Sequence, residues 1–278
     1  MVIVRRTLVI GLGVISLAAC GGADAADLSE LAQTWPHPDK PGATIEFYYA
    51  TSLMAGPRPL IVCLHGHQSS NPSLGGGVFV QWGELQRLTD LGFAVVAVSL
   101  PGFGGSTGPA DFAGRYTQNA VAAVIHHLQQ TGRATPGKTI IQGISLGALT
   151  GALLAARGED IQGLVLISGA YDLAALFANK SLTGINEVMA QMRIQTGGGA
   201  AAIDARSVLK TAGSIKAKTL ILNGARDDRT DPLQAMQLQD AIRRAGGTAE
   251  SVIYPEFGHS IPFEARQDRV DQFLQQFL

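Results

Sequence analysis

The sequence predicts a single α/β domain with a doubly wound, mostly parallel sheet. Short, continuous apolar runs such as residues 60–64 and 93–100 alternate with helix-forming segments, as in sheets that helices cover on both faces. The stretch Gly-Ile-Ser-Leu-Gly at residues 143–147 stands between an apolar run at 139–141 and a segment of helix formers at 146–157. A strand, a tight turn and a helix are therefore expected in that order.

The other elements follow from local patterns. Before residues 143–147 we expect an irregular, proline-rich entry at 28–41, strands at 43–50 and 60–64, a helix at 80–91, a strand at 93–100 and a helix at 117–131. After that stretch we expect strands at 163–168, 218–223 and 249–254, a helix that starts near Pro232 and ends at Gly246, and a closing helix with an apolar stripe at 270–278. The strand at 43–50 alternates apolar and polar residues and opens the sheet as an antiparallel strand.

The regular alternation is interrupted once, between the strands at 163–168 and 218–223. This segment holds helix-like pieces and a glycine and alanine run at 197–202. An insertion of this kind is typical of a small cap over a site at the carboxyl ends of the strands. With 278 residues, of which 46% are hydrophobic and 15% charged, the chain is predicted to form one domain at 43–278 with a cap at about 172–217.

The N-terminus has the pattern of a bacterial export signal. Arg5 and Arg6 precede an uncharged run at 7–19 that is too short to span a membrane. Leu-Ala-Ala-Cys at 17–20 resembles a lipobox, which predicts a signal peptide at 1–19, a lipid on Cys20 and a tether and entry segment at 20–42. An Ala-x-Ala site at 23–25 is the alternative, and it would release a soluble periplasmic or secreted protein. We expect an exported protein of the cell envelope, held at the membrane by its lipid anchor.

Several classes of function are disfavoured. The formal net charge is −1, so no basic excess favours nucleic acid as a partner. The glycine-rich stretch at 101–106 lacks the Gly-Lys-Ser/Thr ending of a phosphate-binding loop. The six histidines form no His-x-x-x-His pair, and Cys63 lies in an apolar run as a small buried residue. We therefore expect no metal and no cofactor.

Three residues that follow predicted strands can act together chemically. Ser145, Asp227 and His259 would meet where the carboxyl ends of parallel strands lie side by side. A serine hydroxyl needs a base to take its proton, and an imidazole base needs an anion that orients it and stabilises its charged form. Asp228 and Asp172 stay open as alternative acids, because sequence alone does not measure their reach.

The chain resembles the α/β-hydrolase superfamily over nearly all of its mature length. The motifs that carry the resemblance are His-Gly-His at 65–67, Pro-Gly-Phe-Gly-Gly-Ser at 101–106, Gly-Ile-Ser-Leu-Gly at 143–147, Gly-Ala-Arg-Asp at 224–227 and Gly-His at 258–259. Within the superfamily it is most similar to the dienelactone-hydrolase and prolyl-oligopeptidase catalytic-domain group, on Tyr-Asp-Leu at 171–173 and the stretch at 223–232. Dienelactone hydrolases use a cysteine nucleophile, whereas this chain has serine at that position.

The resemblance implies a role for each site residue. Ser145 would be the nucleophile, His259 the general base and then acid, and Asp227 the orienting acid, while the backbone N–H groups of His67 and Leu146 would form the oxyanion hole. The expected function is an exported serine hydrolase that cleaves a small carboxylic ester through an acyl-enzyme. A serine peptidase of prolyl-oligopeptidase type acting on short peptides is the first alternative, and a surface binding protein without activity is the second.

Overall fold

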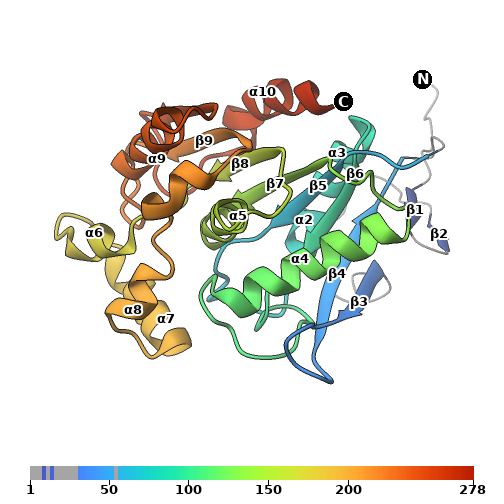
Figure 1. Cartoon of the computed structure of the whole chain (residues 1–278), viewed down its shortest axis with the longest axis horizontal. Coiled ribbons are helices and arrows are strands. Elements are labelled where there is room, and N and C mark those ends of the chain that lie inside the picture. The colour runs from blue at the N-terminus through green and yellow to red at the C-terminus, as the bar shows by residue number, and fades with distance from the viewer. Residues whose placement is uncertain (1–7, 11–12, 16–30, 53–55) are drawn as a thin grey trace.

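A single eight-stranded sheet forms the centre of the molecule (Figure 1). The computed structural model describes residues 8–10, 13–15, 31–52 and 56–278. The strand order is β10-β9-β8-β7-β5-β6-β4-β3. These strands are β3 (Ala32–Pro36), β4 (Thr44–Ala50), β5 (Leu60–Leu64), β6 (Ala94–Val98), β7 (Thr139–Ile144), β8 (Gly163–Ile167), β9 (Lys218–Gly224) and β10 (Ala249–Tyr254). β4 is antiparallel to both β3 and β6 and all other neighbours are parallel, so the predicted sheet is confirmed.

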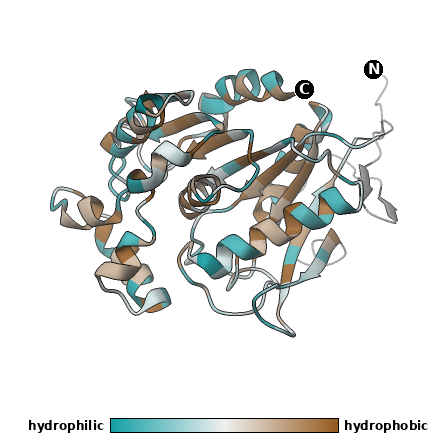
Figure 2. Ribbon diagram, viewed as in Figure 1, coloured by the Kyte–Doolittle hydropathy of each residue, from teal (hydrophilic) through white to brown (hydrophobic). Residues whose placement is uncertain are grey.

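Helices cover both faces of this sheet. One face packs against α4 (Arg115–Gln130), α5 (Leu146–Ala156) and α9 (Leu233–Arg244), and the other against α2 (Gly77–Gln81), α3 (Glu84–Asp90) and α10 (Phe263–Leu274), which a short helix η2 (Gln275–Phe277) follows. Every residue of β5, β6 and β8 is consequently buried. Figure 2 shows the hydrophobic colour concentrated in these central strands and hydrophilic colour on the outer helices.

Two expected elements differ from the structure. The predicted helix at 80–91 is two short helices separated by Gly83, whose φ of 71° ends the first one. Val78 and Phe79 of α2 are buried instead of Trp82, which is 60% exposed. The segment expected to be an irregular entry contains β3, paired antiparallel with β4 at the edge of the sheet. An edge strand tolerates Pro36 at its end, because one side of its backbone makes no ladder bonds.

A helical insertion lies between β8 and β9, where the cap is expected. It contains α6 (Leu173–Ala178), α7 (Ile185–Thr196), α8 (Ala200–Asp204) and a 3-10 helix, η1 (Val208–Ser214). In Figure 1 the three α-helices project beyond the sheet at the left of the view. α7 is anchored by the buried side chains of Ile185 and Met192.

Part of the predicted export signal is described. β1 (Leu8–Ile10) and β2 (Gly13–Ile15) pair as a two-stranded antiparallel sheet. Cys20 and the alternative cleavage site at 23–25 lie outside the described residues. Within the described part of the chain, no helix has the length and apolar character that a membrane span requires.

The central helix α5 approaches the sheet closely because residue 151 has no side chain. A Cβ atom on Gly151 would lie 2.8 Å from the Ile141 Cγ2 of β7. We therefore expect Gly151→Ala to lower the free energy of unfolding by about 1–3 kcal/mol through overpacking. Chemical denaturation of the variant measures this change.

Gly213→Ala is the matched control for that substitution. Gly213 is exposed in η1, and its nearest neighbour would be the Ala245 methyl carbon at 3.2 Å. Equal unfolding free energies for the two variants would show that α5 adjusts its distance from β7 without cost.

Candidate active site

Ser145 sits at a strained corner between β7 and α5. Its φ of 52° and ψ of −111° lie in a region that residues with a side chain rarely adopt. The flanking glycines are required by close backbone contacts. A Cβ atom on Gly143 would collide with the Gly147 carbonyl oxygen, and one on Gly147 would collide with the Leu64 carbonyl oxygen of β5. The expected tight turn is therefore confirmed, and it holds the serine above the end of the sheet.

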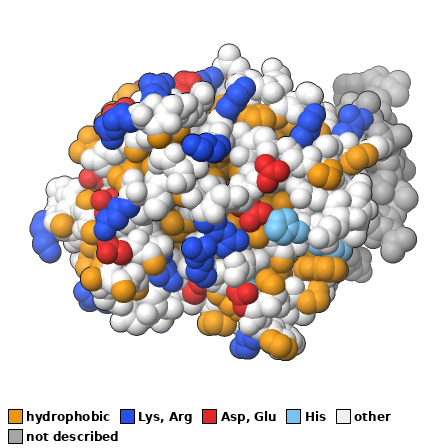
Figure 3. Space-filling view, viewed as in Figure 1, with side chains coloured by type: hydrophobic (Ala, Val, Ile, Leu, Met, Phe, Trp, Pro, Cys, Tyr) orange, Lys and Arg blue, Asp and Glu red, His pale blue; other side chains and the backbone are white. Residues whose placement is uncertain are grey.

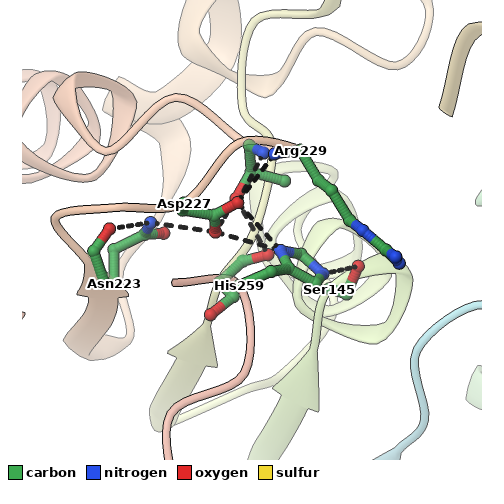
Figure 4. A network of polar contacts seen from close by, with 8 residues as sticks. Ser145, Asn223, Asp227, Arg229 and His259 are labelled. Carbon is green, nitrogen blue, oxygen red and sulfur yellow. Dashed lines mark hydrogen bonds and ion pairs between the residues drawn. The ribbon is translucent and has the colours of Figure 1, made fainter. Parts of the chain in front are cut away.

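The structure brings the three predicted side chains together. His259 follows β10, and its Nε2 atom lies 3.1 Å from the Ser145 Oγ atom. Asp227 follows β9, and its two carboxylate oxygens lie 2.9 and 3.1 Å from the His259 Nδ1 atom. Figure 4 shows the three side chains in one line, with the imidazole between the hydroxyl and the carboxylate. A carboxylate at Nδ1 favours the tautomer with its proton there, which leaves Nε2 free to accept the serine proton.

Asp227 is held rigidly as an anion. It is 3% exposed, and its Oδ1 accepts hydrogen bonds from the backbone N–H groups of Arg229 and Thr230, each at 2.9 Å. Its Oδ2 accepts bonds from the Thr230 hydroxyl at 2.6 Å and the Asn223 amide at 3.2 Å. Burial alone would raise the pKa of Asp227, but His259 and Thr230 together outweigh it, so the pKa lies below its ordinary value.

The other two candidate acids do not contact the imidazole. Asp228 accepts a hydrogen bond from the Thr183 hydroxyl at 2.9 Å. Asp172 caps the start of α6, where it accepts a bond from the Ala175 backbone N–H at 3.0 Å. Of the three aspartates, only Asp227 lies within hydrogen-bonding distance of His259.

The two histidines of the loop after β5 have different surroundings. His65 is fully enclosed, and burial lowers its pKa to about 4, so the ring is neutral. Its Nδ1 donates to the Gly66 carbonyl at 2.7 Å, which leaves Nε2 to accept the Leu100 N–H at 3.0 Å. Through these two hydrogen bonds His65 holds the loop after β5 against the residues that follow β6. His67 lines the cavity beside Ser145; burial lowers its pKa, and Glu187 and Gln191 partly oppose that change.

A cavity of about 310 Å³ opens next to Ser145. Its apolar lining includes Val78, Phe112, Leu149, Ala170 and Val188. Its remaining lining includes Gln68, Glu187, Gln191 and Arg229. Val188 and Glu187 belong to α7, so the helical insertion forms part of the wall.

Sequence patterns do not indicate that Trp82, Phe112, Glu187 and Arg229 line the cavity. Phe112 lies in the loop before α4, and Trp82 follows α2. Glu187 forms an ion pair with Arg229 at 3.6 Å and accepts a hydrogen bond from the Ser69 hydroxyl at 3.3 Å. Arg229 stands two positions after Asp227, so its place in the sequence gives a signal that it lies near the site. Glu187 has no such signal, because its position depends on how α7 packs against the rest of the domain.

The described residues include no candidate metal centre, and charges of both signs are mixed on the face shown in Figure 3. Among the residues that the structure describes, no group of three or more histidine, cysteine, aspartate or glutamate side chains could hold a metal. Figure 3 shows acidic, basic and hydrophobic side chains intermixed over the visible face, without one dominant charge.

Comparison with known proteins identifies the family. The profile of the prolyl oligopeptidase family matches residues 80–278. No curated protein matches the chain. Among solved structures, an acylaminoacyl peptidase of Pyrococcus horikoshii has a TM-score of 0.72 and 16% identity, over 89% of this chain but 41% of that one. The chain thus spans less than half the length of that peptidase.

Two smaller enzymes match over nearly their whole length. An esterase of Pyrococcus furiosus has a TM-score of 0.70 and 18% identity, over 93% of this chain and 96% of that one. A protein of Klebsiella pneumoniae described as a dienelactone hydrolase has a TM-score of 0.61 and 18% identity, over 88% and 97% of the two chains. The expected resemblance is confirmed. The chain belongs to the prolyl oligopeptidase family and has the α/β-hydrolase fold.

Proposed function

We propose that the chain hydrolyses carboxylic esters of small molecules through an acyl-enzyme on Ser145. The observation that carries this proposal is the continuous hydrogen-bond path from Ser145 through His259 to Asp227 beside an open cavity. In this path the hydroxyl has a base, and the base has a buried anion that orients it.

The proposed reaction uses these groups in two steps. Ser145 Oγ attacks the ester carbonyl carbon as its proton moves to His259 Nε2, and the N–H groups of His67 and Leu146 hold the resulting oxyanion. The intermediate expels the alcohol, which takes the proton from His259. Water then attacks the acyl group on Ser145, with His259 again as the base, and the carboxylic acid leaves.

Two features support an ester as the substrate. The apolar residues that line the cavity next to Ser145 suit an uncharged acyl chain. The Pyrococcus furiosus esterase is similar in fold over 93% of this chain and 96% of its own length.

Peptide hydrolysis is the second candidate function. It is supported by membership of the prolyl oligopeptidase family and by Glu187, an acidic group in the cavity that could attract a peptide amino group. Glu187 is already paired with Arg229 and Ser69, which reduces its availability. The ester therefore remains our first choice.

Ser145 is expected to be essential. A fluorophosphonate probe should label the purified protein, and Ser145→Ala should abolish labelling and lower the turnover of p-nitrophenyl esters by about 10⁵-fold or more. In the same assay, aminoacyl p-nitroanilides compare peptide-bond cleavage with ester cleavage.

Ser260→Ala serves as a control for this substitution, because Ser260 also lines the cavity but is absent from the hydrogen-bond path. Labelling of a folded Ser145→Ala protein would refute the proposed nucleophile. Faster turnover of anilides than of esters would favour the peptidase.

The Asp227 carboxylate is expected to support both activity and stability. Asp227→Asn should lower kcat by about 10⁴-fold, since an amide neither stabilises the imidazolium nor selects the required tautomer. Asp228→Asn is the matched control because its side chain bonds Thr183 instead. The kcat for ester hydrolysis at neutral pH should be measured for both variants. An equal loss of kcat in Asp227→Asn and Asp228→Asn would contradict the role of Asp227.

The free energy of unfolding should depend on pH through the ionisation of Asp227. Because the folded pKa lies below the ordinary value of 3.8, ionised Asp227 stabilises the protein above about pH 3.8. This contribution is lost as the pH falls through the lower, folded pKa. The stability difference between wild type and Asp227→Asn, measured by urea unfolding, should therefore shrink from pH 7 to pH 3.

We further propose that the enzyme is exported and anchored to the membrane through a lipid on Cys20. The support is the order of Arg5 and Arg6, an apolar run and a lipobox. In a bacterial host supplied with a labelled fatty acid, the full chain should become labelled and enter the detergent phase, and Cys20→Ala should do neither. A wild-type protein cleaved after Ala25 would contradict the anchor.

A further inference from the structure

The loop before α4 is held in an unfavourable backbone conformation next to the active site. Phe112 and Ala113 are consecutive residues with φ angles of 50° and 60°, and both are buried. Such a conformation is unfavourable for a residue with a side chain and persists only where the surroundings impose it. Neither residue is glycine, so the contacts around this loop must hold it in place.

One set of contacts comes from the body of the domain. The Asp111 carboxylate accepts hydrogen bonds from the Tyr116 N–H at 2.9 Å and from the Thr117 hydroxyl at 2.5 Å, both in the first turn of α4. The Ala113 carbonyl accepts a bond from the Gln118 side chain at 2.9 Å. These bonds fix the two ends of the loop but leave the backbone of Phe112 without a partner.

The partners of that backbone come from the helical insertion. Gln195, near the end of α7, accepts the Phe112 N–H at 2.9 Å. Arg206, which follows α8, donates from Nε to the Phe112 carbonyl at 2.7 Å and from its terminal nitrogen to the Asp111 carbonyl at 2.5 Å. Arg206 is 9% exposed and also bonds the Ala202 carbonyl at 3.0 Å. Two cap side chains therefore satisfy both polar groups of the strained residue.

The side chain of Phe112 lines the cavity beside Ser145. The cap helix α7 reaches the same cavity through Val188 and Gln191. Together with Gln195 these positions have the spacing of one helix face. A single face of α7 therefore lines the cavity and hydrogen-bonds the loop at Phe112. The position of Phe112 thus depends on the position of the cap.

We propose that Gln195 and Arg206 are positioning residues that hold Phe112 as a wall of the acyl-binding subsite, so that the cap sets which acyl chains are accepted. This inference rests on the proposed ester hydrolysis. Without the Gln195 acceptor, the Phe112 N–H would be buried and unpaired, and the loop would relax from its left-handed conformation. Phe112 would then leave the wall, and long acyl chains would lose an apolar partner.

The main test compares Gln195→Ala with wild type on p-nitrophenyl acetate and p-nitrophenyl octanoate. We expect kcat/KM for the octanoate to fall about tenfold through KM, while kcat for the acetate changes less than about twofold, because a missing apolar contact discriminates between chains by such factors. Gln195→Glu keeps an oxygen acceptor for the Phe112 N–H and should restore the preference. Ile194→Ala is the control on the same helix, since Ile194 is 76% exposed.

A double-mutant cycle separates this role from a general loss of structure. Phe112→Ala should reproduce the lower octanoate preference, and adding Gln195→Ala to it should cause no further change in the ratio of octanoate to acetate kcat/KM. Additive effects of the two substitutions on that ratio would overturn the proposal. So would equal losses on acetate and octanoate in Gln195→Ala.

Hydrogen exchange tests the same contact without any substrate. In wild type the Phe112 amide should exchange slowly, and Gln195→Ala should accelerate it at least tenfold while α5 amides keep their rates. Unchanged exchange would overturn the proposal even in an enzyme that hydrolyses esters. If exchange accelerates but neither ester is cleaved by wild type, the proposed function fails and the assignment of a subsite for acyl chains fails with it.

Discussion

The position of Ser145 depends on a close approach of three backbone segments. Gly147 at the start of α5 packs against the Leu64 carbonyl of β5, and Gly143 packs against Gly147 across the turn. This packing forces Ser145 into a conformation that an isolated peptide would avoid. The hydroxyl therefore projects into the cavity at the start of a helix, where backbone N–H groups and the helix dipole favour developing negative charge.

The remaining site is arranged around this fixed hydroxyl. β9 and β10 are parallel neighbours, so the loops that follow them carry Asp227 and His259 to the same edge of the sheet. Gly224 allows the loop of His259 to pass closely, since a Cβ atom there would collide with the Phe257 and Gly258 carbonyls. His259, followed by the hydroxyl and N–H groups of Thr230, then favours the anionic form of Asp227 despite its burial. The helical insertion completes the site by lining part of the cavity and by hydrogen-bonding the strained loop at Phe112.

Much of this arrangement could be predicted from local sequence. The order of strands and helices follows from apolar runs and their period, and the turn at Ser145 follows from its two glycines. Other features could not be predicted, because they depend on contacts between distant segments. Trp82 has the spacing of a buried helical residue, yet the left-handed conformation of Gly83 ends that helix and leaves the ring exposed. β3 has little apolar character, and its pairing with β4 makes it a strand.

The sequence by itself determined the fold class, the order of the nucleophile, acid and base, and the three candidates for the acid. These features depend on residue types, periodicity and short-range turn chemistry, all of which can be recognised from neighbouring residues in the sequence. The tertiary structure decided which aspartate contacts His259, because Asp227 and Asp228 are adjacent and only the direction of the loop after β9 separates them. It also decided the lining of the cavity. Glu187 reaches the cavity, and Gln195 and Arg206 reach the loop at Phe112, only because the insertion folds back toward the site. Such long-range packing has no local signature in the sequence.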